Sequence, residues 1–130
     1  MLRGLATVSF WAADLAAAKS WYTELLGIEP YFERPGYVEF RIGDYQHELG
    51  LIDAAYAPVG VPDVPGGAVM YWHVDDLNAT FETLLAKGAK EYQAPTVRGE
   101  GFVTASVIDP FGNILGVMSN AHYLDVLGQH

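Results

Sequence analysis

The carboxylate with the clearest catalytic potential is Glu48, which lies in the segment His47-Glu48-Leu49-Gly50. A carboxylic acid that is removed from water can have its pKa raised towards neutrality, and it can then act as a general base. His47 is not expected to assist, because neighbouring side chains of a strand point to opposite faces. If the protein is an enzyme, Glu48 is the predicted base; the alternative is a strand residue that faces solvent or pairs with an arginine.

Few other patterns in the chain carry chemistry. The sequence contains no cysteine, which excludes thiolate catalysis, cysteine-bound zinc and disulfide bonds. It also lacks a Ser-His-Asp order and a phosphate-binding loop. Arg41 and Arg98 are possible contacts for an anion, although solvated surface arginines are the simpler interpretation.

Composition limits the class of protein. A chain of 130 residues with 51% hydrophobic residues is sufficient for one domain with a sizeable core. The formal net charge of −9 argues against nucleic acid or an anionic membrane surface as partner. The first residues become polar too soon for a secretory signal, and no apolar run reaches the roughly 18–20 residues of a membrane span. A cytoplasmic protein is expected.

The elements that must position these residues form an internal repeat. A helix is predicted over 15–26, after the N-cap Asp14 and before Gly27, and a second over 77–85, after Asp75 and Asp76 and before Gly88. Alternating or apolar stretches predict one strand before each helix and three after it. These strands are 5–11, 30–33, 37–42 and 47–52 in the first half, and 68–74, 91–93, 102–108 and 114–118 in the second.

The repeat predicts a single α+β domain built from two βαβββ modules. Module one covers about 4–52 and module two about 68–118, and the proline- and glycine-containing stretch 53–67 is the predicted linker. The tail, 119–130, is predicted to be a short helix or arm. Three of its side chains are available for docking: Tyr123, Leu124 and Leu127.

Two motifs resemble the vicinal oxygen chelate superfamily, which includes glyoxalase I, extradiol dioxygenases and bleomycin-sequestering proteins. The first is Asp14-Leu15 … Trp21-Tyr22 … Leu25-Leu26-Gly27, and the second is the hairpin Asp109-Pro110-Phe111-Gly112-Asn113. The resemblance extends from Leu5 to Met118. It implies two βαβββ modules that form a curved mixed sheet around a central cavity, and it makes a homodimer the expected assembly.

The resemblance also implies where a metal would bind. Catalytic members hold a divalent metal with His, Glu or Gln side chains from the first and last strands of each module. Alignment of the motifs places these positions at Thr7, Glu48, Met70 and Gly116. Because Thr, Met and Gly are poor ligands for such ions, no metal site and no cofactor are expected. A register shift of one residue would instead bring His73 or His47 into consideration.

With no metal, the same sheet faces are predicted to line a small-molecule pocket. Alternation places aromatic, apolar and small residues beside the vacated ligand positions, which is typical of such pockets. The glycines are expected to leave space for a ligand, and the tryptophans to offer stacking faces. A simple apolar core is the alternative. The predicted ligand-binding residues are Thr7, Ser9, Trp11, Glu48, Gly50, Met70, Trp72, Phe102, Gly116 and Met118.

The favoured function is metal-independent binding or sequestration of a bulky aromatic or hydrophobic small molecule, similar to antibiotic-resistance members of the superfamily. The main alternative is an enzyme of the superfamily, a lyase, isomerase or dioxygenase, that uses Glu48 as a base or a displaced metal. A domain that only mediates protein contacts is a third hypothesis.

Overall fold

The computed structural model describes residues 1–60 and 64–129. The chain divides into two compact units, Met1–Val61 and Pro62–His130, which correspond to the two halves of the repeat. The boundary between them falls within the stretch predicted as a linker.

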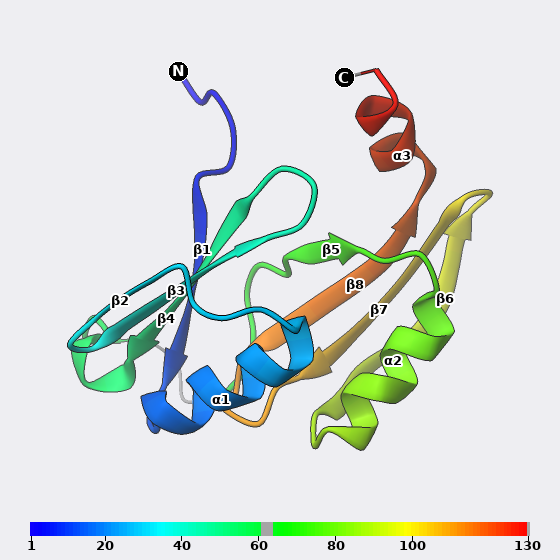
Figure 1. Cartoon of the computed structure of the whole chain (residues 1–130). Coiled ribbons are helices and arrows are strands. Elements are labelled where there is room, and N and C mark those ends of the chain that lie inside the picture. Colours follow the sequence, from blue (N-terminus) through cyan, green and yellow to red (C-terminus); the bar gives the residue numbers. More distant parts are fainter. Residues whose placement is uncertain (61–63, 130) are drawn as a thin grey trace. The chain divides into compact units, whose positions relative to one another are not determined.

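The first unit is a four-stranded mixed sheet with one long helix (Figure 1). The strands follow the order β1-β4-β3-β2, in which β1 and β4 are parallel and the other neighbours are antiparallel. Its elements are β1 (Thr7–Ala12), α1 (Leu15–Leu26), β2 (Phe32–Arg34), β3 (Tyr37–Ile42), β4 (His47–Asp53) and the 3₁₀ helix η1 (Ala54–Tyr56).

Helix α1 is bounded as the sequence predicts. The Asp14 carboxylate accepts a hydrogen bond from the amide of Ala17, and Gly27 ends the helix with a φ of 68°. The helix packs on β3 and β4, and it buries Tyr22 to 1% exposure. Each large apolar side chain removed from water there stabilises the fold by about 1.5–3 kcal/mol. The strand residues of this core are Phe10, Ala12, Val38, Phe40, Leu49 and Leu51.

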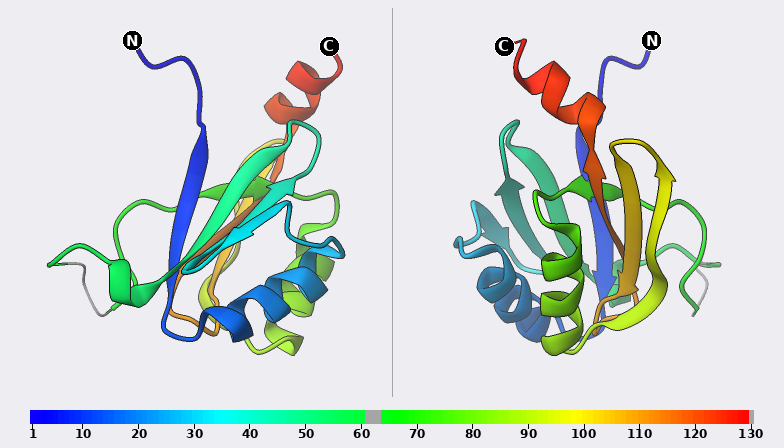
Figure 2. Two further views of the ribbon diagram at one scale, coloured as in Figure 1. Left: turned by 60° about the vertical axis from the view of Figure 1, so that its left-hand side comes forward. Right: turned by 90° about the vertical axis from the view of Figure 1, so that its right-hand side faces the viewer.

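The second unit repeats the topology of the first, with strand order β5-β8-β7-β6 (Figures 1 and 2). Its elements are β5 (Tyr71–His73), α2 (Leu77–Ala86), β6 (Lys90–Gly99), β7 (Phe102–Ile108), β8 (Ile114–Asn120) and α3 (Ala121–Leu127). Helix α2 packs on β6, β7 and β8 and buries Leu77, Phe81 and Leu84. The strand residues of this core include Ala105, Val107, Leu115 and Val117. Two βαβββ modules in an α+β fold are therefore confirmed.

The turn between β7 and β8 is organised around one buried carboxylate. Asp109 is 3% exposed, and its Oδ1 accepts hydrogen bonds from the amides of Phe111 (2.9 Å) and Asn113 (2.8 Å). The side-chain amide of Asn113 donates to the same carboxylate. Gly112 adopts a φ of 92°, which favours glycine. The Asp-Pro-x-Gly-Asn sequence is thus a structural device that fixes the start of β8.

Several predicted boundaries are wrong. β5 contains only Tyr71–His73, whereas a strand over 68–74 was expected. β6 runs over Lys90–Gly99 instead of 91–93; all of its residues are exposed, so the sequence carries no alternation to reveal its length. β4 and η1 occupy the first residues of the predicted linker.

The tail was predicted to be a short helix or an arm, and residues Ala121–Leu127 form the helix α3. β8 extends to Asn120, whose side-chain oxygen accepts a hydrogen bond from the amide of Tyr123 and caps α3. Tyr123 is partly buried, whereas Leu124 is 49% exposed. Within the described residues, no helix has the length and apolar character required to cross a membrane.

Candidate functional site

The first module presents a regular grid of side chains on the sheet face opposite its core. Parallel pairing places Thr7 beside Glu48, Ser9 beside Gly50, and Trp11 beside Ile52. The intervening residues, such as Phe10 and Leu49, face the core. The predicted sharing of one face by the β1 and β4 candidates is therefore confirmed, while their role in binding stays a prediction.

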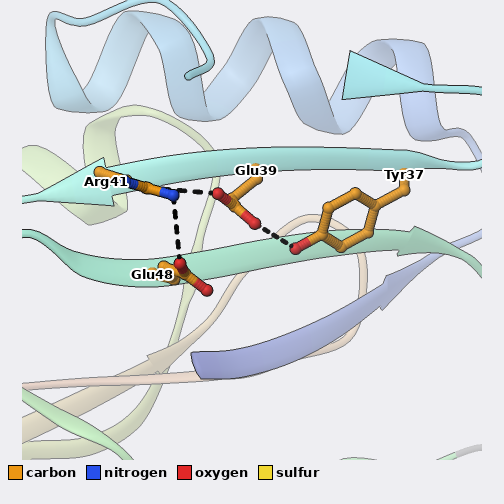
Figure 3. Close-up of polar contacts among 4 residues, drawn as sticks. All are labelled: Tyr37, Glu39, Arg41 and Glu48. Atoms are coloured by element: carbon orange, nitrogen blue, oxygen red, sulfur yellow. Dashed lines mark hydrogen bonds and ion pairs between the residues drawn. The ribbon is translucent and has the colours of Figure 1, made fainter. Parts of the chain in front are cut away.

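Strand β3 completes this face with three polar side chains. Its antiparallel pairing places Arg41 beside Glu48, Glu39 beside Gly50, and Tyr37 beside Ile52. A polar chain connects them (Figure 3): the Tyr37 hydroxyl donates to Glu39 Oε1 at 2.8 Å, and Arg41 Nε lies 3.4 Å from Glu39 Oε2. Arg41 Nη2 lies 3.5 Å from Glu48 Oε1. We call Tyr37, Glu39, Arg41 and Glu48 the β3–β4 cluster.

The most buried carboxylate of this cluster is Glu39 rather than Glu48. The Glu39 side chain is 11% exposed, whereas the Glu48 side chain is 31% exposed and pairs with Arg41. For Glu48, the arginine-paired interpretation is thus the one that the structure shows. Glu39 was missed, although the alternation in Tyr37-Val38-Glu39-Phe40-Arg41 carries the signal: the two apolar residues face the core, so the three polar ones share the opposite face.

Tyr37 is held in its neutral form. Burial, the hydrogen bond to Glu39 and the nearby Glu39 and Glu48 charges raise its pKa from 10.0 to about 12, against the smaller lowering effect of Arg41. At neutral pH its hydroxyl therefore keeps its proton and donates it to Glu39.

This pKa leads to a testable pH dependence. Because the pKa of Tyr37 is raised on folding from 10.0 to about 12, its contribution to stability is complete below pH 10 and is lost as the pH rises towards 12. An ultraviolet titration of phenolate formation should show one tyrosine that ionises near pH 12 in the wild type and is missing in Tyr37→Phe. A difference curve centred near pH 10 would contradict the hydrogen-bonded, buried state of Tyr37.

In the second module, the structure places Trp72 on the opposite face of the sheet from the one predicted. Parallel pairing sets Tyr71 beside Gly116, and His73 beside Met118, so that Trp72 pairs with the core residue Val117. The expected common face of Trp72 and Gly116 is therefore wrong. Met70 lies just before β5, where its carbonyl accepts a hydrogen bond from the Gly116 amide at 3.1 Å.

The error has a local cause. Both Asp75 and Asp76 were possible caps, and counting from Asp75 placed the strand one residue out of register. The structure shows that Asp76 is the N-cap, with its carboxylate accepting from the Ala79 amide at 3.0 Å. Since side chains alternate along a strand, a shift of one residue exchanges the two faces.

The corrected face of the second module carries Met118 beside Gly116, as predicted, together with Phe102, Tyr71 and His73. His73 stacks on Tyr123 of α3, with ring centroids 4.7 Å apart and an interplanar angle of 11°. Its Nδ1 accepts a hydrogen bond from the Asn120 amide at 3.2 Å. The tail helix is thus docked on its own module through His73.

The two glycines at the centre of these faces are each covered by a tyrosine ring. A Cβ added to Gly50 would lie 2.9 Å from Tyr37 Cε1, and one added to Gly116 would lie 2.7 Å from Tyr71 Cδ1. The expectation that the glycines leave open space for a ligand is therefore wrong: in each module, the space is filled by the module's own aromatic side chain.

Comparison with known proteins agrees with this architecture. The family model described as the Glyoxalase/Bleomycin resistance protein/Dioxygenase superfamily matches residues 4–117. The chain belongs to this superfamily. No curated protein sequence shows significant similarity to the chain.

Three similar solved structures illustrate the diversity of the superfamily. A glyoxalase-related enzyme from Fulvimarina pelagi is 22% identical, with a TM-score of 0.70, and 90% of this chain and 88% of that chain are covered. A bleomycin resistance determinant encoded on transposon Tn5 is 22% identical, with a TM-score of 0.65 and coverage of 91% and 98%. A lactoylglutathione lyase from Agrobacterium tumefaciens is 20% identical, with a TM-score of 0.69 and coverage of 95% and 97%.

The structure also revises the positions at which catalytic members of the superfamily hold a metal. Ser9 and Tyr71 occupy the same place before their N-caps, and they pair with Gly50 and Gly116. If Gly116 is the last-strand position of module two, its counterpart is Gly50, not Glu48. Thr7 lies seven residues before the N-cap Asp14, and the residue seven before the N-cap Asp76 is Val69, so Val69 replaces Met70 as the first-strand position of module two.

The residues at these four positions do not fit a catalytic metal. Neither glycine nor valine supplies a side-chain donor, and Thr7 offers only a neutral hydroxyl. Among the residues that the structure describes, no three His, Asp or Glu side chains are grouped so that they could hold a metal ion. We therefore derive no chemistry through a metal at these positions.

Proposed function

We propose that this superfamily member binds a bulky aromatic or hydrophobic small molecule without a metal ion and leaves it chemically unchanged, as in antibiotic sequestration. The observation that carries the proposal is the replacement of last-strand metal ligands by Gly50 and Gly116, each covered by a tyrosine ring. Where catalytic members hold a metal ion, which acts as a Lewis acid, this chain thus offers the apolar surface of a tyrosine ring for stacking.

The composition of the two sheet faces supports binding. The first offers Trp11 and Ile52 beside Tyr37, and the second offers Phe102 and Met118. Aromatic and flexible apolar side chains with a few fixed polar groups are typical of small-molecule sites.

The enzymatic alternative receives less support from the surroundings of Glu48. A general base must be free to take a proton from its substrate, whereas the Glu48 side chain is 31% exposed and is already paired with Arg41, whose Nη2 lies 3.5 Å from Glu48 Oε1. These surroundings suit a charged anchor for a ligand rather than a base.

Binding is tested first with Nile red, a bulky neutral aromatic dye whose emission increases in apolar surroundings. We expect saturable enhancement, and we expect Trp11→Ala to weaken the affinity by about tenfold, since the loss of one aromatic contact costs roughly 1.4 kcal/mol or more. Tyr92→Ala is the matched control: Tyr92 is 44% exposed on β6, and its removal should change the affinity by less than about twofold.

Two results would contradict the proposal. One is the absence of saturable binding, or an equal effect of the Trp11 and Tyr92 substitutions. The other is recovery of a bound compound in chemically altered form, as measured by mass spectrometry after incubation. In that case Glu48→Gln would test the base directly, because an enzyme that depends on Glu48 should lose its turnover.

The proposed assembly is a homodimer, and the proposed location is the cytoplasm. Light scattering coupled to size-exclusion chromatography should give twice the 14.2 kDa chain mass, and a monomeric mass would contradict the dimer.

A further inference from the structure

We propose that the ligand carries a positively charged N–H group, such as a protonated amine or an amidinium, and presents it to the oxygens of Tyr37 and Glu48. The inference rests on the proposed function and adds a chemical class to it: an aromatic body joined to a cationic hydrogen-bond donor. All the residues that support it belong to the first module.

The hydrogen bond between Tyr37 and Glu39 decides what the Tyr37 oxygen can still bind. A tyrosine hydroxyl has one proton to donate, and Tyr37 donates it to Glu39 at 2.8 Å. The Tyr37 oxygen can then only accept a hydrogen bond from a further molecule.

The β3–β4 cluster carries a net negative charge. The Arg41 guanidinium is already shared between Glu39 and Glu48, at 3.4 Å and 3.5 Å, and its carbon lies 3.7 Å above the centroid of the Tyr31 ring. Two carboxylates and one guanidinium leave a net charge of −1. A ligand carboxylate or sulfonate would therefore be repelled by the negative charge and by the hydrogen-bond acceptors. A cation with N–H groups would be attracted by the charge and could donate hydrogen bonds to the acceptors.

The Glu48 carboxylate and the apolar side chains of Trp11 and Ile52 lie in different rows of the same sheet face. Trp11, Ile52 and Tyr37 form one row of the grid, and Thr7, Glu48 and Arg41 form a row four residues further along the strands. The Tyr37 ring covers Gly50 in the row between them. Four residues of strand separate these rows by about 13 Å. This spacing suits a fused aromatic ring system that lies at the Trp11 end, with a short arm that reaches Glu48.

The test uses two tricyclic probes that carry opposite charges at the end of the same short arm, 3-(anthracen-9-yl)propylamine, which is cationic at neutral pH, and 3-(anthracen-9-yl)propanoate. Affinities are measured by equilibrium dialysis at low and moderate salt. We expect the cationic probe to bind at least about tenfold more tightly, and we expect Glu48→Gln and Tyr37→Phe each to weaken its binding by about three- to tenfold. Tyr37→Phe keeps the ring over Gly50 and removes only the oxygen.

Glu100→Gln is the matched control, because Glu100 is an exposed turn residue of the other module and its substitution changes the net charge of the chain equally. It should alter the affinity by less than about twofold. Equal losses from Glu48→Gln and Glu100→Gln would mean general surface attraction and would overturn the inference. So would equal or tighter binding of the carboxylate, or no binding of the amine.

These failures are distinguishable from failure of the proposed function. Nile red is neutral and reports the apolar surface, so the wild type and Glu48→Gln should bind it alike. If Nile red binds in the Trp11-dependent manner described above while the charged probes show no preference, the binding function stands and only the cationic class is wrong.

Discussion

Gly116→Ala is expected to lower the free energy of unfolding by about 3 kcal/mol, because the added methyl group has no room. Its Cβ would lie 2.7 Å from the Met70 carbonyl oxygen and 2.7 Å from Tyr71 Cδ1. The Met70 carbonyl belongs to the backbone next to β5 and accepts a hydrogen bond from the Gly116 amide. It therefore cannot move without disturbing the parallel β5–β8 pairing. Urea unfolding of the variant and the wild type measures the difference.

Two further glycine substitutions serve as comparisons. Gly50→Ala should cost less, about 1 kcal/mol, because its Cβ would meet only the side chain of Tyr37, which can rotate away. Gly99→Ala, on an exposed strand with nothing within 4 Å of the added Cβ, should be neutral or slightly stabilising. An equal cost at Gly99 and Gly116 would contradict the close approach of Tyr71 and Met70 to β8.

Asp109→Ala is expected to destabilise the protein by about 3 kcal/mol, because it removes the buried carboxylate that accepts hydrogen bonds from the amides of Phe111 and Asn113. Asp109→Asn retains one acceptor oxygen but sets an amide group against the donor of Asn113, so an intermediate loss is expected. Thermal or urea unfolding gives the comparison.

Asp125→Ala is the control for this pair, since Asp125 is exposed on α3. Its effect should stay within about 0.5 kcal/mol. If Asp109→Ala is no more harmful than Asp125→Ala, the carboxylate does not organise the β7–β8 turn.

Much of the fold is predictable because its signals are local. Asp14 and Gly27 bound α1 through a cap and a left-handed residue, and both act within a few residues of sequence. The alternation of Thr7, Ser9 and Trp11 with buried neighbours likewise fixes which side chains share a face. Such features depend little on distant parts of the chain.

The errors arise where local signals are ambiguous or absent. Two adjacent aspartates before α2 allowed a count that was one residue out, and this exchanged the faces of Trp72 and His73. The exposed strand β6 has no buried side that would create a pattern.

The candidate site was predicted less well than the fold, because side-chain reach cannot be read from alternation. Glycine at positions 50 and 116 indicated open space, yet the neighbouring rings of Tyr37 and Tyr71 cover both. Alternation along β3 does place Glu39 on the same face as Tyr37 and Arg41, but only the structure shows its contacts with both.

Ligand binding by this chain is proposed to be independent of a metal, and elemental analysis tests this independence most directly. The protein is incubated with Zn²⁺, Ni²⁺, Mn²⁺ and Fe²⁺, desalted and analysed for bound metal. The donor set at Thr7, Gly50, Val69 and Gly116 predicts less than about a tenth of an equivalent of each ion. A content near one equivalent of any ion would contradict the account and would give the enzymatic alternative priority.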